Sequence, residues 1–295
     1  MKTLLISTLA LFAFFRAEAQ VTLDLAQDQD QYLPNEAIRL AVKITNRSGQ
    51  QLHLGATPTW LTFNAESEDG PVVVQKGEVP VVEPFDLESS QMATKYVDLQ
   101  PYFELARPGR YKVTATMRIE QWSVAISSAP VHFDIISGAE LWSQDFGVTA
   151  ATNAPPEPRK YTLLKANYLR EQLRLYVQVT SGVDGRILAV TPLGPLVSFS
   201  SPEEQVDGSS QLHVLWQTGA QSFTYLIVSP DGAVVEREVY DSANSRPRLS
   251  VNGVGDVVVK GGARRPNSED APPATPIMPV TPVTPMVPAT QPASQ

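Results

Sequence analysis

Three histidines are the first residues to consider for acid–base or metal chemistry, because imidazole serves both roles near neutral pH. They are His53, His132 and His213, and no two have the i, i+4 spacing of a helical zinc pair. Each falls within a predicted strand among apolar residues. His132 and Asp134 share one face of such a strand and could form half of a metal or acid–base site. We interpret this pair as part of the solvated outer face of a sheet.

Carboxylates gather in three predicted loops. Asp28, Asp30 and Glu36 form an oxygen-rich cluster and are candidate calcium ligands. Their segment lacks the glycine and the spaced final glutamate of a dedicated calcium loop, so we predict no dedicated metal site. Acid pairs also occur within residues 66–69 and 203–204. A glycosidase needs two carboxylates that face each other, whereas adjacent loop acids are more often simply solvated.

Other catalytic signatures are missing from the sequence. It contains no Gly-x-Ser-x-Gly elbow, no phosphate-binding loop and no dinucleotide fingerprint. The chain has no cysteine, which excludes thiol catalysis, disulfides and thiolate metal sites. We therefore predict that the protein is not an enzyme and uses no cofactor.

Aromatic residues are the remaining candidates for ligand binding. Exposed aromatic rings can stack on sugars, and the tryptophans are Trp60, Trp122, Trp142 and Trp216. At this composition most of them are expected in a core. Trp122, in a turn between the last two strands of the first predicted domain, is the candidate for an exposed platform.

Composition limits the compartment and the kind of partner. A chain of 295 residues can hold two domains, and its net charge of −8 provides no basic field for nucleic acid. Residues 1–19 have the pattern of a secretory signal peptide, with Lys2, an apolar run and a small-x-small site at Ala17–Ala19. An uncleaved anchor is the alternative. We expect a bacterial periplasmic or extracellular protein that does not insert into the membrane after signal cleavage.

Residues 20–137 show the alternation of antiparallel strands. Between Tyr111 and Ile119 every second residue is apolar, directly after a Pro-Gly turn. About eight such short strands, separated by turn residues, predict an all-β sandwich.

Two segments of this domain carry a resemblance to a known fold. Tyr32-Leu-Pro-Asn-Glu-Ala-Ile, an alternating strand and then Asn46-Arg-Ser-Gly are similar to the opening of bacterial extracellular immunoglobulin-like modules. The segment from Leu105 to Val113 resembles the later corner of such modules, where a tyrosine, here Tyr111, hydrogen-bonds back across the corner. The resemblance implies that Trp60 is the core tryptophan of the third strand. It also implies a spacer or binding role.

Residues 138–160 are predicted to be a Pro-containing linker, and residues 161–262 a second antiparallel β domain. Within it, Gln172–Val177 matches Gln211–Trp216, and Thr191–Val197 matches Ser229–Val235. Units of about 40 residues resemble the blades of a β-propeller, but two units and a fragment cannot close a ring. An open repeat sheet, a small sandwich, assembly between chains, and chance similarity of two hairpins all remain possible.

The resemblance to a propeller suggests sialidase-type hydrolysis as a possible activity. That chemistry requires several arginines that converge in a closed ring. The arginines near the end of the incomplete repeat are Arg246, Arg248, Arg264 and Arg265. Because they lie at one end of an open array, we do not predict this activity.

Residues 263–295 differ from the rest of the chain. Prolines recur at every third position from Pro273 to Pro288, which is the period of a polyproline II helix. We predict a disordered Pro/Thr-rich tail that acts as a spacer, a ligand for a groove, an O-glycosylated stalk, or an end without a partner.

Together these features predict a non-catalytic secreted or envelope protein that serves in interaction or scaffolding, with an unknown envelope protein or glycan as its partner. A carbohydrate-binding module that uses exposed aromatics is the first alternative. A glycan-active enzyme subunit, completed by oligomerisation, is the second.

Overall fold

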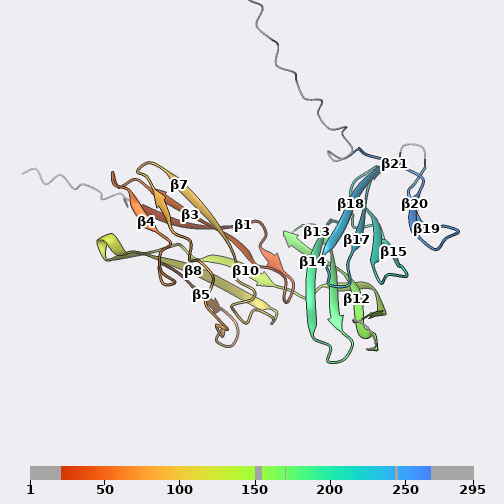
Figure 1. Ribbon diagram of the computed structural model, residues 1–295, viewed down its shortest axis with the longest axis horizontal. Coiled ribbons are helices and arrows are strands. Elements are labelled where there is room, and N and C mark those ends of the chain that lie inside the picture. Colours follow the sequence, from red (N-terminus) through yellow and green to blue (C-terminus); the bar gives the residue numbers. More distant parts are fainter. Residues whose placement is uncertain (1–20, 150–154, 170, 243–244, 267–295) are drawn as a thin grey trace, which may run out of the picture.

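The computed structural model describes residues 21–149, 155–169, 171–242 and 245–266, which form two β-sandwiches lying end to end (Figure 1). Secondary structure in these residues consists of strands and one short 3-10 turn, so the predicted all-β class is confirmed. Among the described residues, no helix has the length and hydropathy needed to cross a membrane. The predicted signal peptide, residues 1–19, and residues 267–295 of the predicted tail lie outside the described part. The tail was predicted to begin at residue 263, which is too early, because Ala263 and Arg264 pair with Asp241 and Tyr240 in a sheet.

The first sandwich contains two main sheets. One has the order β1-β3-β7, and the other has the order β2-β10-β8-β5 with β9 beside β8. All strand pairs in this sandwich are antiparallel except β2 with β10, which run parallel. A further pair, β4 with β6, forms a separate ribbon. The strands are β1 (Val21–Gln27), β2 (Gln31–Tyr32), β3 (Arg39–Asn46), β4 (Leu52–Leu54), β5 (Leu61–Ser67), β6 (Phe85–Leu87), β7 (Met92–Asp98), β8 (Gly109–Ile119), β9 (Val124–Ser127) and β10 (Val131–Ile135).

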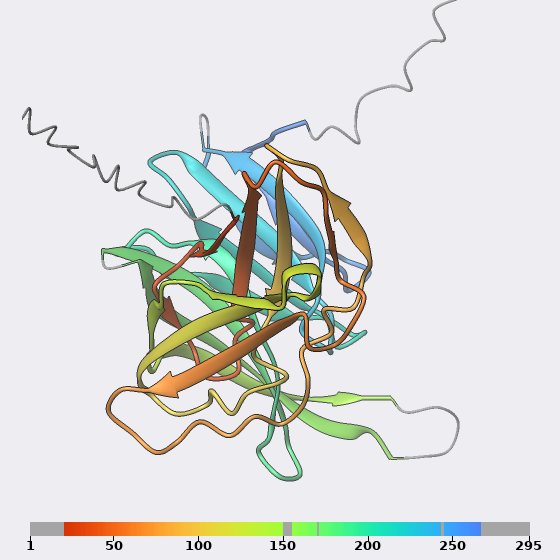
Figure 2. The same cartoon turned by 90° about the vertical axis from the view of Figure 1, so that its left-hand side faces the viewer.

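The alternation along β8 builds the core of this sandwich. From Tyr111 to Ile119 every second side chain is buried, and the side chains between them face outward. Buried residues of β1 and β3, in the opposite sheet, belong to the same hydrophobic cluster. Figure 2 shows the first sandwich end-on, in front of the second. The strand predicted from the period of two is therefore confirmed.

Two aromatic residues tie loops to the core of the first sandwich. The Tyr111 hydroxyl donates to the Arg107 carbonyl oxygen at 2.8 Å, across the turn that precedes β8. Trp60 is 2% exposed and donates its Nε1–H to the Val81 carbonyl oxygen at 2.9 Å, which anchors the long segment between β5 and β6. The predictions that Tyr111 bonds back across its corner and that Trp60 is a core residue are both confirmed.

The second sandwich contains two antiparallel meanders. The first has the order β11-β12-β13-β14 and the second the order β15-β16-β17-β18-β21, while β19 and β20 form a separate hairpin. The strands are β11 (Ala139–Val148), β12 (Glu157–Leu169), β13 (Gln172–Ser181), β14 (Ile187–Pro195), β15 (Glu203–Val206), β16 (Leu212–Gln217), β17 (Ser222–Val228), β18 (Val234–Asp241), β19 (Arg248–Val251), β20 (Val257–Lys260) and β21 (Ala263–Arg264).

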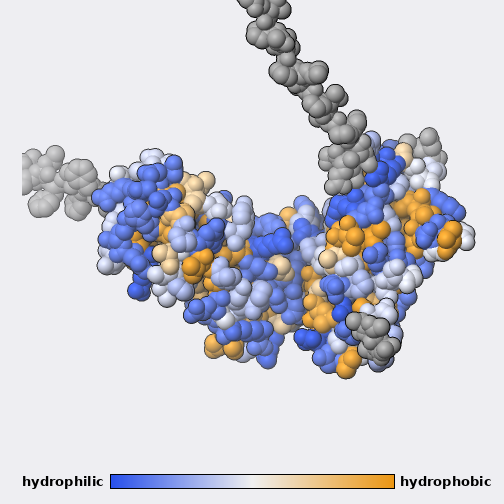
Figure 3. Space-filling model, in the orientation of Figure 1, coloured by the Kyte–Doolittle hydropathy of each residue, from blue (hydrophilic) through white to orange (hydrophobic). Residues whose placement is uncertain are grey.

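The two meanders share one core, so the region is a closed sandwich and not an open repeat sheet. Leu175 and Val177 of β13 belong to the same buried cluster as Val214 and Trp216 of β16. The hairpin of β19 and β20 covers part of the outer face of the second meander, where Leu249 packs with the cluster that includes Phe223, Tyr225 and Leu215. Apolar areas remain visible on the surface over β17–β20 (Figure 3).

The predicted linker of residues 138–160 is wrong over its described part. It contains β11 and the beginning of β12, which pair from Ala139 with Lys165 to Val148 with Glu157. Pro155 and Pro156 stand just before β12, where the missing backbone N–H groups interrupt no sheet ladder. In the described residues from Pro155 onward, the proline-rich composition thus marks the start of a strand.

The predicted repeat is wrong in its second match. Thr191–Val197 lies mostly within β14, whereas Ser229–Val235 spans the turn between β17 and β18. In that turn Gly232 has a φ of +84° and donates its N–H to the Ser229 carbonyl oxygen at 2.8 Å. Similar proline and glycine spacing therefore serves a strand at one place and a hairpin turn at the other.

Candidate functional site

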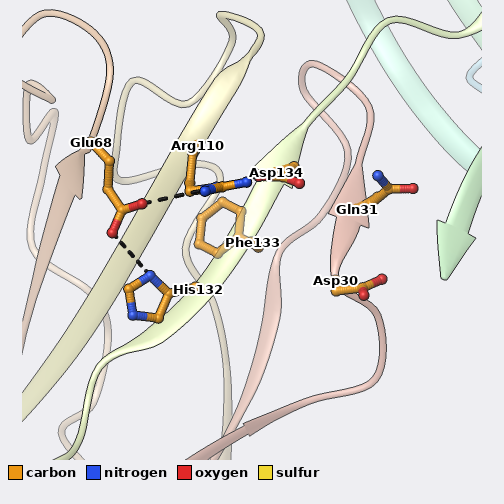
Figure 4. A pocket seen from close by; sticks show the side chains of 7 residues that line it. All are labelled: Asp30, Gln31, Glu68, Arg110, His132, Phe133 and Asp134. Atoms are coloured by element: carbon orange, nitrogen blue, oxygen red, sulfur yellow. Dashed lines mark hydrogen bonds and ion pairs between the residues drawn. The ribbon is translucent and has the colours of Figure 1, made fainter. Parts of the chain in front are cut away.

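A hollow of about 410 Å³ opens on the first sandwich where β2, β10 and β8 lie side by side (Figure 4). Because β10 lies between β2 and β8, Asp134 is opposite Arg110 on one side and Gln31 on the other. This register places residues of all three strands around the hollow. Glu68 reaches the hollow from the end of β5, which neighbours β8. Its lining residues are Asp30, Gln31, Glu68, Arg110, His132, Phe133 and Asp134.

Ion pairs connect the polar side chains along one side of the hollow. The Arg110 Nε atom lies 3.3 Å from Asp134 Oδ1 and 3.9 Å from Glu68 Oε2. The His132 Nδ1 atom lies 3.0 Å from Glu68 Oε1. The Arg110 and His132 side chains are more than half exposed, and exposed pairs of this kind contribute only about 0–1 kcal/mol each. The network therefore adds little to stability, and its polar atoms face solvent where a ligand can reach them.

Two oxygen atoms near the hollow have unused capacity to accept hydrogen bonds. Asp30 Oδ1 and Gln31 Oε1 are shielded from solvent, and neither has a hydrogen-bond partner among the described residues. A buried acceptor without a donor carries a free-energy cost. Because both oxygens are covered, a ligand in the hollow would meet the partly exposed Glu68 and Asp134 carboxylates and not these two atoms. The lining contains no nucleophilic hydroxyl or amine.

The structure joins candidates that are far apart in the sequence. The outward position predicted for His132 and Asp134 is confirmed, and the two residues meet Glu68 from the acid pair at residues 66–69 and Asp30 from the calcium cluster. Arg110 was missed by sequence reasoning. Its outward position in the alternation of β8 was the only signal for it. Which residues of the neighbouring strands lie opposite Arg110 depends on the strand register, which is not a local property of the sequence.

The calcium candidates are divided between different surroundings. Glu36 is buried, and its carboxylate accepts hydrogen bonds from Gln29 Nε2 and from the Leu33 backbone N–H, both at 2.8 Å. Asp28 lines a second hollow with Glu36, whereas Asp30 lines the hollow of Figure 4. No group of three or more histidine and carboxylate side chains in the described residues is placed to hold a metal ion. That this segment holds no dedicated calcium site stays a prediction.

Glu36 belongs instead to the junction between the sandwiches. Gln29 accepts a hydrogen bond of 2.5 Å from Arg174 Nη1 of β13, so Arg174, Gln29 and Glu36 form a chain across the junction. Leu33 packs beside this chain against a cluster on the outer face of the first meander that includes Tyr176. Burial raises the pKa of the Glu36 carboxyl above its ordinary value.

The other histidines are placed separately. His53 is exposed on β4, with Nδ1 at 2.5 Å from Asp86 Oδ1. His213 is buried on β16 between the Tyr225 hydroxyl, at 2.6 Å from Nδ1, and Asp207 Oδ2, at 3.2 Å from Nε2. Burial raises the pKa of Tyr225 to about 12. Both ring nitrogens of His213 therefore have hydrogen-bond partners.

Glu203 and Glu204 do not face each other. Glu203 accepts a hydrogen bond from the Leu249 backbone N–H at 2.9 Å, and its Oε1 lies 3.5 Å from Arg248 Nη1. Burial raises the pKa of Glu204. Because neighbours on a strand point to opposite faces, the two carboxylates cannot act together on one bond.

The four C-terminal arginines have separate partners and do not converge. Arg246 lies over the Phe223 ring, Arg264 pairs with Glu238, and Arg265 pairs with Asp241. The fourth, Arg248, is the partner of Glu203 described above. These four arginines therefore do not form the converging set that sialidase-type hydrolysis requires.

Trp122 is less accessible than expected. It ends the 3-10 turn Glu120–Trp122 between β8 and β9, and its side chain is half-buried against the first core. Sequence reasoning missed the more exposed ring, Tyr96 on β7, which is 76% exposed.

Fold and site together define an all-β protein of two sandwiches with an ion-paired polar hollow on the first. No protein-family model matches the chain, and no curated protein matches it. Among the solved structures that match is the sporulation control protein Spo0M from Bacillus subtilis, at 10% identity and a TM-score of 0.30, over 59% of this chain and 90% of that one. A likeness at this score supports no conclusion about function.

Proposed function

We propose that this protein is an exported, non-catalytic interaction or scaffolding protein whose first sandwich is an immunoglobulin-like binding module. The strand order supports the module, because β1-β3-β7 and β5-β8-β10 correspond to strands A-B-E and C-F-G of the immunoglobulin fold. Tyr111 then lies at the start of strand F, at the corner where such domains have a hydrogen-bonded tyrosine.

The observation that carries this proposal is the hollow of Figure 4. Polar side chains from separate segments converge there, and the Arg110 and His132 side chains are more than half exposed. Its three carboxylates outnumber its one guanidinium, so we propose that it binds a ligand group with several N–H donors, such as a lysine or arginine side chain of a protein partner.

A scaffolding role is supported by the junction. The hydrogen-bond chain from Arg174 to Glu36 and the packing of Leu33 hold the second sandwich against the first without a flexible spacer. A partner bound at the hollow would therefore keep a fixed position relative to the second sandwich.

Retention of partners from native envelope extract by the immobilised full chain tests the proposal. The double variant Glu68→Gln/Asp134→Asn removes two of the carboxylates of the hollow and preserves side-chain size. The matched control is Glu78→Gln/Glu88→Gln, which makes the same charge change at exposed positions outside the hollow.

We expect a partner that the wild type and the control retain equally and that the hollow variant retains about tenfold less, the effect of losing about 1.4 kcal/mol of binding free energy. Equal retention by all three proteins would exclude the hollow as the binding site. Hydrolysis of a glycan or ester in a broad activity screen, lost in Asp134→Asn, would overturn the non-catalytic assignment.

Carbohydrate binding is a second candidate function, and one specific observation favours it. Tyr96 presents an aromatic ring to solvent on the outer face of the sheet β1-β3-β7, beside the largest of the described hollows, with a volume of about 590 Å³. Trp122 offers no comparable surface, because it packs against the core.

A further inference from the structure

We propose that the outer face of the sheet β1-β3-β7 binds a neutral oligosaccharide, with Tyr96 as its stacking platform. This inference rests on the carbohydrate-binding candidate and is independent of the ion-paired hollow, which lies on the other sheet of the same sandwich.

The strand register builds a shallow trough beside Tyr96. Ala26 of β1 is opposite Ala41 of β3, and Ala41 is opposite Tyr96 of β7, so the three side chains form one row across the sheet. The methyl groups of Ala26 and Ala41 form the shallow apolar floor of the trough, and the Tyr96 ring stands at its edge. Because β7 is an edge strand, no neighbouring strand covers this ring. A flat ring beside a low apolar floor fits the C–H face of a sugar.

Hydrogen-bonding side chains stand on both sides of the row. Arg39 and Lys43 are two residues before and after Ala41 on β3, so they share its face and their Cα atoms are about 13 Å apart. Both side chains are exposed, and neither forms an ion pair among the described residues. Asp28 lines the same hollow and adds an acceptor. This separation of donors suits an extended ligand more than a single ion.

The balance of charge selects the class of ligand. Asp24 is opposite Lys43 in the register, and Asp28 lies in the hollow with Arg39, so positive and negative groups alternate over the face. A polyanion would meet the two aspartates, and a polycation would meet Arg39 and Lys43. Hydroxyl groups donate and accept hydrogen bonds, so a neutral sugar chain can use both kinds of side chain.

The trough continues toward the junction of the sandwiches. Asp28 and Arg39 also line a smaller hollow of about 270 Å³, together with Arg174 and Thr191 of the second sandwich. The two hollows therefore meet at these shared residues. A ligand of several sugar units would follow this line from Tyr96 toward the junction.

Affinity electrophoresis of the full chain tests the inference, with neutral soluble β-glucan, xylan and dextran cast separately into native gels. Polygalacturonate, DNA and anionic lipid vesicles are the comparison probes. Tyr96→Ala removes the platform, and Ala41→Leu fills the floor. Phe199→Ala is the matched control, because Phe199 is an aromatic residue, 80% exposed, on the second sandwich.

We expect at least one neutral polysaccharide to retard the wild type and the Phe199→Ala variant equally. Tyr96→Ala and Ala41→Leu should each weaken the apparent affinity about tenfold. The hollow variant Glu68→Gln/Asp134→Asn should bind as the wild type does, which separates this inference from the proposal for the ion-paired hollow.

Four results would overturn the inference. The first is no retardation by any neutral polysaccharide, and the second is unchanged retardation of Tyr96→Ala. The third is binding only to polygalacturonate, DNA or vesicles. The fourth is self-association in the absence of polysaccharide that Tyr96→Ala abolishes. The last result would assign this face to a second copy of the chain.

Discussion

The hydrogen bond from the Tyr111 hydroxyl to the Arg107 carbonyl oxygen provides a direct test of how the first sandwich is held together. Tyr111→Phe removes this bond of 2.8 Å and leaves the buried ring in place, stacked on Phe133 at a centroid distance of 5.8 Å. The ring keeps its packing, so no cavity cost is added. Arg107 is exposed and its carbonyl can bond to water, so the loss should lie within the range of a single hydrogen bond, about 0.5–1.5 kcal/mol.

Urea unfolding followed by tryptophan fluorescence measures this difference. The midpoint should fall and the m-value should stay unchanged, because the variant exposes the same surface on unfolding. The control is Tyr96→Phe, which removes an exposed hydroxyl and should change the free energy of unfolding by less than about 0.5 kcal/mol. Equal stability of the two variants would refute the corner bond as a stabilising contact. A loss above about 3 kcal/mol would refute the assumption that the ring keeps its place.

Three further substitutions test other parts of the first sandwich. In Gly55→Ala the new Cβ would lie 1.9 Å from the Glu83 carbonyl oxygen at a φ of +84°, so unfolding measurements should show a loss above about 1 kcal/mol. Trp60→Ala should cost about 3–5 kcal/mol in the same assay, from the cavity and the lost bond to Val81. Because burial raises the pKa of Glu36, this residue stabilises the fold below the ordinary carboxyl pKa and loses that contribution as pH rises through its folded pKa. Glu36→Gln should therefore flatten the pH dependence of the free energy of unfolding above the ordinary carboxyl pKa of about 4.3.

Each of these substitutions has a control or an excluding result. Gly49→Ala has a φ of +80° with open space around the new methyl group, so it isolates backbone strain from the clash and should cost less than Gly55→Ala. Val72→Ala changes a side chain that is 90% exposed and should leave stability unchanged, in contrast to Trp60→Ala. A steeper pH dependence in Glu36→Gln than in the wild type would contradict the assigned direction of its pKa shift.

Local patterns predicted the strands of the first sandwich, because alternation of apolar residues reports directly on one buried face. The same reasoning fails on β7, where Met92, Thr94 and Tyr96 alternate with Ala93, Lys95 and Val97. Hydropathy favours burying Met92 and Tyr96, yet the structure leaves both exposed and buries Val97. Which face of a strand meets the core depends on the opposite sheet, and that information is not local.

The candidate site was only partly predictable for the same reason. His132 and Asp134 were recognised as a pair and Glu68 separately, but the meeting of the pair with Glu68 depends on how β10, β8 and β5 lie in one sheet. Arg110 could not be added without that register. The strand β11 was missed because its hydrogen-bonding partner begins at Glu157, after a proline-rich segment whose composition is also typical of linkers.

The parallel pairing of β2 with β10 determines how the first sandwich would transmit tension. A pull on the two ends of the chain draws β2 toward its N-terminal end and β10 toward its C-terminal end. Since the strands run parallel, these forces are opposed along one axis. The bonds from Asp134 N–H to the Asp30 carbonyl and from Ile136 N–H to the Tyr32 carbonyl, each 2.9 Å, are then sheared together and do not open one after the other. These two bonds therefore oppose a pull along β2 and β10 toward the second sandwich (Figure 1).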